Sequence, residues 1–289
     1  MRPKINTHIL AVLSSFCCIT FLSGAWGQPL VFGPEFFSSE SGTSVRKAKS
    51  FSVQDTDQEF ILSVQSWWGS DTRGDRSSLD VNQEFFVSRD DILRKPKIYK
   101  KPVRLEKQNN ISVETTANAS MPVFVTIMSL KEHATTAKIS PSGGVVGLAG
   151  YATAILPAAT FDGPQDITLS ITASPFTQNI FEINAAGPRL PYEIRINTGS
   201  VAPEKDIEVS VNYPISFYSP DYQIHVFAQM HDNPDAPGVH DRFFPVSSRL
   251  NDTARTATTM LPKHAFSNRY GKNGTYEAII TMGLTRFAH

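Results

Sequence analysis

Apolar and polar residues alternate with a period of two along most of the chain, which is the pattern of β-strands with one face in a core and one in water. Ile111–Thr115 and Val123–Ile127 show this alternation clearly, and Phe60–Gln65 is rich in aromatic and β-branched residues. Beyond the N-terminal segment, no long window has the 3.6-residue period of a helix, and only Ser88–Arg94 could form one helical turn. The pattern predicts an all-β chain.

The predicted strands fall into two groups. The first group comprises Phe51–Gln54, Phe60–Gln65, Val81–Val87, Val103–Leu105, Ile111–Thr115 and Val123–Ile127. The second comprises Ala152–Leu156, Ile167–Ile171, Tyr192–Ile196, Ile207–Val211, Ile224–Met230, Arg242–Val246, Ala254–Leu261 and Tyr276–Gly283. Between the groups, Lys131–Lys138 is polar and lacks alternation, and Pro141–Gly144 is a turn cluster. We therefore expect two tandem antiparallel β-sandwich domains, residues 28–134 and 135–289, after a signal peptide, residues 1–27.

The signal peptide is predicted from three features of the N-terminus. Arg2 and Lys4 are basic, Ile9–Leu22 is largely apolar, and the small residues Ala25 and Gly27 occupy the positions that a signal peptidase reads. The apolar run is shorter than the roughly 20 residues of a membrane-spanning helix, which disfavours a retained anchor. We expect cleavage after Gly27, no membrane span in the mature form, and a secreted, periplasmic or cell-surface location.

Cysteine content and charge narrow the function classes. Both cysteines, Cys17 and Cys18, lie in the predicted signal peptide, and the residue before each is too large for a lipid-attachment site. The mature chain would then contain no disulfide, thiol nucleophile or thiolate metal site. The full chain has 27 basic and 27 acidic residues, so its charge gives no reason to expect a nucleic-acid partner.

The first half resembles small Ig-like β-sandwich modules of bacterial exported proteins. The resemblance rests on Phe32–Phe37 as an entry strand, Lys49–Val53 and Phe60–Val64 as a hairpin, and Asn82–Phe85 as a middle strand. The strand pattern itself gives about seven strands between residues 29 and 130, a number that suits an immunoglobulin-like sandwich.

The second half resembles a ZU5-type domain. Gly143–Val145, Ala154–Ala158 and Phe161 match the family's Gly-Gly turn, strand and Ile-Pro-Ala-Gly-Ala-like corner, although Leu156 and Thr160 depart from it. Such domains are protein-interaction or scaffold modules that often accompany a cell-wall peptidase. The shared motifs build turns and cores, so the resemblance implies a fold and no functional residues.

No catalytic spacing stands out, and no cofactor is expected. The chain lacks a Gly-x-Ser-x-Gly elbow, a His-Glu-x-x-His helix and a phosphate-binding glycine loop. The candidate metal ligands are His231, Asp232, Asp235 and His240, because carboxylates suit calcium and imidazoles suit zinc. Their Asp, Asn, Pro and Gly content also suits a solvated loop between two strands, and that interpretation is favoured over a metal site.

Trp67 and Trp68 are the candidate ligand-binding residues. Adjacent strand residues point to opposite faces, so both rings cannot enter one core, and an exposed ring could stack on a sugar. A packing role at the end of the sandwich is the more common alternative.

The sequence therefore favours an exported, non-enzymatic protein that binds an envelope protein or a cell-wall polysaccharide, or that acts as a scaffold. Two alternatives stay open. One is a hydrolase or metal-dependent enzyme with a site assembled across strands, and the other is a surface-layer or appendage subunit that pairs through sheet edges.

Overall fold

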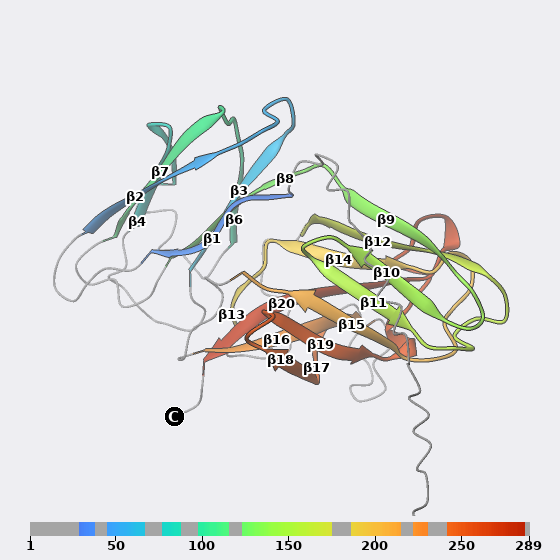
Figure 1. Cartoon of the computed structure of the whole chain (residues 1–289). Coiled ribbons are helices and arrows are strands. Elements are labelled where there is room, and N and C mark those ends of the chain that lie inside the picture. Colours follow the sequence, from blue (N-terminus) through green and yellow to red (C-terminus); the bar gives the residue numbers. More distant parts are fainter. Residues whose placement is uncertain are drawn as a thin grey trace, which may run out of the picture.

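The computed structural model confirms the all-β fold (Figure 1). It describes residues 29–37, 45–66, 77–87, 98–115, 123–174, 186–214, 222–230 and 242–286. The predicted signal peptide and the possible helical turn at Ser88–Arg94 lie outside these ranges. Within them the chain forms four sheets in which all paired strands are antiparallel, and two 3₁₀ turns, η2 (Lys263–Ala265) and η3 (Lys272–Gly274).

The strands before residue 130 form two four-stranded sheets that enclose one core. The inner sheet, in the order β1-β8-β3-β6, contains β1 (Leu30–Phe37), β8 (Val123–Ser129), β3 (Phe60–Ser66) and β6 (Ile98–Val103). The outer sheet, in the order β2-β7-β4-β5, contains β2 (Val45–Ser52), β7 (Gln108–Thr115), β4 (Ser77–Val81) and β5 (Glu84–Val87). The core between them includes Phe37, Phe60, Leu62, Leu79, Ile111 and Ile127. We call this unit the first sandwich.

The strands after residue 132 form a second, larger pair of sheets. One sheet has seven strands in the order β17-β16-β20-β14-β12-β9, and β13 pairs with β20 beside this path. Its strands are β17 (Arg242–Val246), β16 (Tyr222–Met230), β20 (Glu277–Arg286), β14 (Tyr192–Asn197), β12 (Gln165–Ala173), β9 (His133–Ile139) and β13 (Ala186–Arg189). The five-stranded sheet, in the order β10-β11-β15-β19-β18, contains β10 (Gly144–Leu148), β11 (Ala152–Leu156), β15 (Ile207–Asn212), β19 (Thr256–Leu261) and β18 (Ser248–Asn251). We call this unit the second sandwich.

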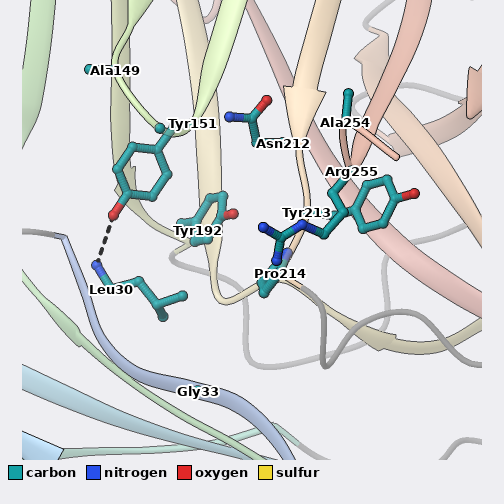
Figure 2. Close-up of a pocket in the computed structure, with 11 residues that line it drawn as sticks. Leu30, Gly33, Ala149, Tyr151, Tyr192, Asn212, Tyr213, Pro214, Ala254 and Arg255 are labelled. Atoms are coloured by element: carbon teal, nitrogen blue, oxygen red, sulfur yellow. Dashed lines mark hydrogen bonds between the residues drawn. The ribbon is translucent and has the colours of Figure 1, made fainter. Parts of the chain in front are cut away.

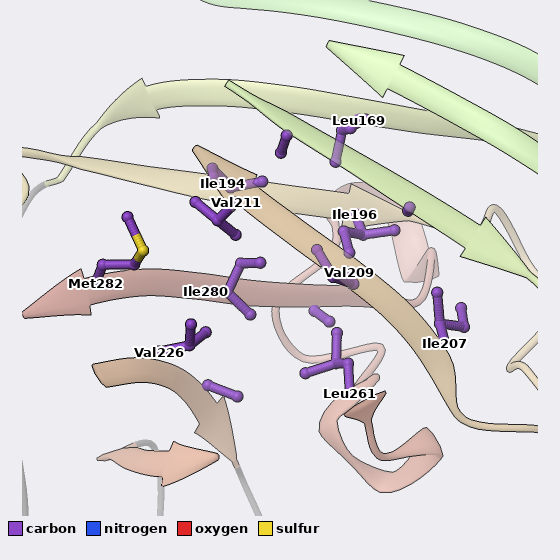
Figure 3. Packing of buried hydrophobic residues seen from close by; sticks show 14 of the residues in the cluster. Leu169, Ile194, Ile196, Ile207, Val209, Val211, Val226, Leu261, Ile280 and Met282 are labelled. Atoms are coloured by element: carbon purple, nitrogen blue, oxygen red, sulfur yellow. The ribbon is translucent and has the colours of Figure 1, made fainter. Parts of the chain in front are cut away.

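Period-two alternation produces the core of the second sandwich (Figure 3). β15 is buried at every other residue, so that Ile207, Val209 and Val211 point inward. They pack towards Ile194 and Ile280 of the opposite sheet, which belong to the same buried cluster. The sequence alternation therefore sets which face of each sheet is apolar.

Prolines within described strands occur only at sheet edges or in the side-paired strand. Pro34 lies in β1, Pro102 in β6 and Pro245 in β17, and each of these strands ends a sheet, whereas Pro188 lies in β13. Proline has no N–H to donate to a ladder, so an edge is where a strand tolerates it.

The two sandwiches meet through β8, which is buried along its whole length. Val123, Val125 and Ile127 point into the first sandwich, whereas Phe124 and Met128 belong to the buried cluster of the second. One face of the inner sheet is thus covered by the outer sheet and the other by the second sandwich. The chain passes from the sheets of the first sandwich to those of the second between Ser129 and His133.

The expected hairpin of Lys49–Val53 and Phe60–Val64 is wrong. β2 pairs with β7, whereas β3 pairs with β6 and β8, so the two strands lie in different sheets. Val123–Ile127 was expected to have one face in water, but β8 is buried on both faces because the second sandwich covers it.

Two further expectations about individual strands were wrong. Val81–Val87 is not one strand, because Asn82 and Gln83 have positive φ values of 50° and 68° and form the tight turn between β4 and β5. The supposed middle strand Asn82–Phe85 is therefore half turn. The polar segment Lys131–Lys138 is largely β9, an edge strand whose side chains are mostly exposed, which removes the apolar alternation that would have revealed it.

Candidate functional site

The residues singled out from sequence lie outside the part of the chain that the structure describes. Trp67 and Trp68 follow the last residue of β3. His231, Asp232, Asp235 and His240 fall in the sequence between β16 and β17. Among the described residues, no group of three or more His, Cys, Asp or Glu side chains could hold a metal ion.

A pocket of about 420 Å³ lies where one end of the second sandwich meets β1 (Figure 2). Leu30 and Gly33 of the first sandwich form one wall. The second sandwich supplies the end of β15, the start of β14 and the turns between β10 and β11 and between β18 and β19. Antiparallel pairing places these segments together, since Ala152 pairs with Val211 and Asn212 with Thr256. The pocket is a product of the fold and not of one continuous motif.

Polar groups of the pocket come from Tyr151, Tyr192, Asn212 and Arg255, whose side chains gather around one space in Figure 2. Tyr213 also lines the pocket, but its hydroxyl donates to Asp252. The Tyr151 and Tyr192 rings meet edge to face, with their centroids 6.0 Å apart. The Leu30 N–H donates a hydrogen bond of 3.4 Å to the Tyr151 hydroxyl, which links the two sandwiches at the pocket floor. The site therefore combines aromatic walls with a hydroxyl, an amide and a guanidinium, a composition typical of small-molecule pockets.

Burial keeps both phenols protonated. It raises the pKa of Tyr151 to about 12 and raises that of Tyr192 further above its ordinary value. Since the neutral phenol can donate as well as accept, both hydroxyls retain donor capacity across the physiological range.

The Arg255 guanidinium is exposed and forms no ion pair with any described carboxylate. The neighbouring carboxylate of Asp252 accepts a hydrogen bond of 2.9 Å from the Tyr213 hydroxyl. The backbone of Arg255 has φ 52°, and its carbonyl accepts a 3.0 Å bond from the Tyr213 N–H. A positive φ is unfavourable for a residue with a Cβ, so this turn holds Arg255 in a strained conformation at the pocket rim.

A second polar cluster lies at the contact between the sandwiches and towards the outside of the seven-stranded sheet. Lys100 of β6 donates to the carbonyl oxygen of Ser174, and the Ser174 hydroxyl donates to Glu193 at 3.0 Å. Arg195 then links Glu193 to Glu277, with N–O distances of 3.0 Å to each. This chain of contacts runs from the first sandwich into the second.

Burial perturbs the charged groups of this cluster. Burial and the nearby Arg189 lower the pKa of Lys100 to about 8, against the opposing effect of Glu193. Burial also lowers the pKa of Arg189 to about 10 and raises that of Glu277, whose carboxylate Arg195 partly stabilises. Perturbed groups often mark functional sites, but ion-pair networks perturb pKa values as well. These side chains contact one another and none of them lines the pocket, so we assign the cluster to joining the sandwiches.

The outer face of the five-stranded sheet carries a row of exposed apolar side chains. Val145, Ile155 and Met260 are 57%, 41% and 52% exposed. They occupy one line across the strands, because Val145 pairs with Ile155, Ile155 with Glu208, and Glu208 with Met260. This flat row is a separate candidate surface for contact with a protein.

No family model and no curated protein matches the chain. The Ig-like and ZU5-like resemblances thus remain predictions from short motifs. No helix in the described ranges is long and apolar enough to cross a membrane.

The sequence patterns did not single out any of the polar residues of the pocket. Arg255 was placed within a predicted strand, Ala254–Leu261, whereas β19 begins at Thr256. Tyr151 follows a strand, β10, that was not predicted. One sequence feature could have indicated the site. Asn212 and Tyr213 stand at the end of a predicted strand, just before Pro214, and binding residues are often carried by the loops at strand ends.

Proposed function

We propose that this chain is an exported, non-enzymatic binding protein that recognises a cell-wall polysaccharide through the pocket between its sandwiches. The observation that supports the proposal is the pocket lining, which combines Tyr151 and Tyr192 with the exposed guanidinium of Arg255. That guanidinium makes no ion pair with a carboxylate in the described part of the chain. Sugars present apolar ring faces together with hydroxyl groups. A concave site with aromatic walls and a few convergent polar groups matches that chemistry.

Loops carried by a rigid scaffold are the usual location of binding residues. Most pocket residues lie in turns and at strand ends of the second sandwich, and the bond between Leu30 and Tyr151 joins them to β1. Such a site is largely formed before its ligand arrives, so little conformational entropy is lost on binding.

An envelope protein is the competing partner, and the exposed row of Val145, Ile155 and Met260 is where it would bind. The hydrolase alternative requires acid and base groups that converge on a cleft. In the described lining of the pocket, the charged side chain is Arg255, which serves better as an anion ligand than as a proton-transfer group.

The proposal is tested by retention of the mature protein, from Gln28 onward, on isolated cell-wall polysaccharide and on envelope-protein extract. Ala254 lines the pocket and is exposed, so Ala254→Trp should fill the pocket without disturbing a core. Ala158→Trp adds the same ring at an exposed turn outside the pocket and serves as the matched control.

We expect the polysaccharide to retain the wild type and Ala158→Trp, but not Ala254→Trp. Retention by envelope protein alone, abolished by Val145→Thr with Ile155→Thr, would replace the polysaccharide by a protein partner. No retention on either material, or equal retention of both tryptophan variants, contradicts the proposed site.

Export is tested independently of binding. N-terminal sequencing of the processed protein should begin at Gln28. Recovery of an intact Met1 from the secreted fraction would contradict the predicted cleavage.

A further inference from the structure

The charge in the pocket indicates which sugars fit it. Arg255 is the charged side chain among the described lining residues, and it makes no ion pair with any described carboxylate. A guanidinium presents its N–H donors in a planar fork that matches the two oxygens of a carboxylate. A ligand that carries a carboxylate would therefore satisfy a group that the described part of the chain leaves without a counterion.

The backbone holds this guanidinium at the rim. Arg255 has φ 52° in the turn between β18 and β19, and the Tyr213 N–H fixes its carbonyl at 3.0 Å. Glycine would adopt this conformation at lower cost, yet the chain has arginine here. Strained backbone conformations cluster at functional sites, where the surrounding structure enforces the strain.

The uncharged groups of the pocket suit hydroxyls. The amide of Asn212 lines the pocket and offers both donors and an acceptor. The Tyr151 ring is partly exposed beside it and presents an apolar surface. A sugar ring could place its face against Tyr151 and its hydroxyls towards Asn212.

We infer that the pocket binds a carboxylated sugar, a uronic-acid unit of an acidic polysaccharide, with its carboxylate on Arg255 and its hydroxyls on Asn212. The inference rests on the proposed function and narrows its ligand from polysaccharides in general to anionic ones. A pocket of about 420 Å³ lies within the size range of sites for small ligands. It therefore accommodates a short segment of a polysaccharide and not a folded protein domain.

The test is calorimetric titration of the mature protein with trigalacturonic acid and with its methyl ester. The two probes share the same rings and hydroxyls, but the ester has no charge. We expect the acid to bind at least about tenfold more tightly than the ester, because a charge-assisted fork is lost. Equal affinities for the acid and the ester would overturn the inference. This comparison uses only the wild-type protein, so it does not depend on whether a variant folds.

Two arginine variants locate the contact. Arg255→Ala should weaken binding of the acid by about tenfold or more and leave binding of the ester nearly unchanged, whereas Arg255→Lys should recover part of the affinity. Arg249→Ala removes an exposed arginine from the same hairpin, outside the pocket, and should bind as the wild type does. An equal loss in Arg249→Ala would show attraction to general surface charge and would contradict the site.

A peptide with a free C-terminal carboxylate is the third probe. Tighter binding of this peptide than of the sugar acid would assign the pocket to a protein terminus and overturn the inference. The outcomes also separate this inference from the proposed function. If Ala254→Trp abolishes retention on wall polysaccharide while neither charged probe binds, the binding function stands and the acidic ligand is wrong.

Discussion

The side chain of Gln65 forms two hydrogen bonds with the backbone of Arg189, across 124 residues of sequence. Its Nε2 donates to the Arg189 carbonyl at 2.8 Å, and its Oε1 accepts from the Arg189 N–H at 3.1 Å. Both residues are buried, at 1% and 3% exposure. A side-chain amide thus takes the place of a neighbouring strand for β13 and joins the two sandwiches.

Replacement of Gln65 by Ala should destabilise the protein by about 3 kcal/mol, because a buried N–H and a buried carbonyl lose their partners. Urea denaturation measures the loss. Gln54→Ala, at an exposed position, should change stability by less than about 0.5 kcal/mol. A loss at Gln65 no larger than that of the control would mean that water replaces the bridge at no cost.

Lys100 should make stability rise with pH. Its folded pKa of about 8 lies below the ordinary value of 10.5, so between these values the unfolded chain binds more protons. Stability then increases as pH rises from about 8 towards 10. Denaturation across this range should show the increase in the wild type and a flatter profile in Lys100→Met. Lys138→Met, on the exposed face of β9, should follow the wild type. Parallel profiles for all three proteins would contradict the prediction.

Arg195 holds two largely buried carboxylates, and its replacement by Met should cost about 3 kcal/mol at neutral pH. Burial already raises the pKa of Glu277, and loss of Arg195 should raise it further. A carboxyl with a raised folded pKa loses stability as pH increases through that value, so the defect should shrink in acid.

The exposed ion pair of Arg46 and Asp80 supplies the control for Arg195. Its N–O distance is also short, 2.9 Å, but the Arg46 side chain is 63% exposed. Arg46→Met should cost less than about 1 kcal/mol. Equal losses in the two methionine variants, or a loss at Arg195 that does not depend on pH, would remove burial as the explanation.

Gly33 and Gly150 both line the pocket and both have positive φ, 81° and 79°. A Cβ at Gly33 would lie 2.4 Å from the Val125 carbonyl oxygen, whereas a Cβ at Gly150 would meet nothing within 4 Å. Gly150→Ala should therefore cost about 1 kcal/mol from backbone strain alone. Gly33→Ala should cost about 3 kcal/mol, since strand β8 must also shift. Thermal unfolding of the two variants gives the comparison, and equal melting temperatures would contradict it.

Much of the fold could be predicted from sequence because period-two alternation survives wherever a strand has one buried face. Ala152–Leu156 has the predicted bounds for that reason, and the predicted Ile207–Val211 differs from β15 by one residue. The failures occur where the physical cause of alternation is absent. β9 is mostly exposed, and the turn at Asn82 and Gln83 contains no glycine to indicate positive φ.

The pocket could not be predicted because its residues converge only through strand register. Tyr151, Asn212 and Arg255 are far apart in sequence, and each stands at the end of a different strand. Because β10 was not predicted and β19 was predicted to start too early, the sequence did not indicate that the β10–β11 and β18–β19 turns lie at the same end of the sandwich. Trp67 and Trp68 were chosen as candidates for the chemistry of their side chains. That choice does not show which residues lie close together in the folded protein.

The burial of β8 on both faces bears on how this chain can be divided or recombined. A fragment that ends near residue 130 would carry Phe124 and Met128 on a surface that faces water, next to the unpaired side chain of Gln65. Such a fragment should aggregate when it is expressed alone. The two halves should therefore be produced together, as one unit, in any study of either half.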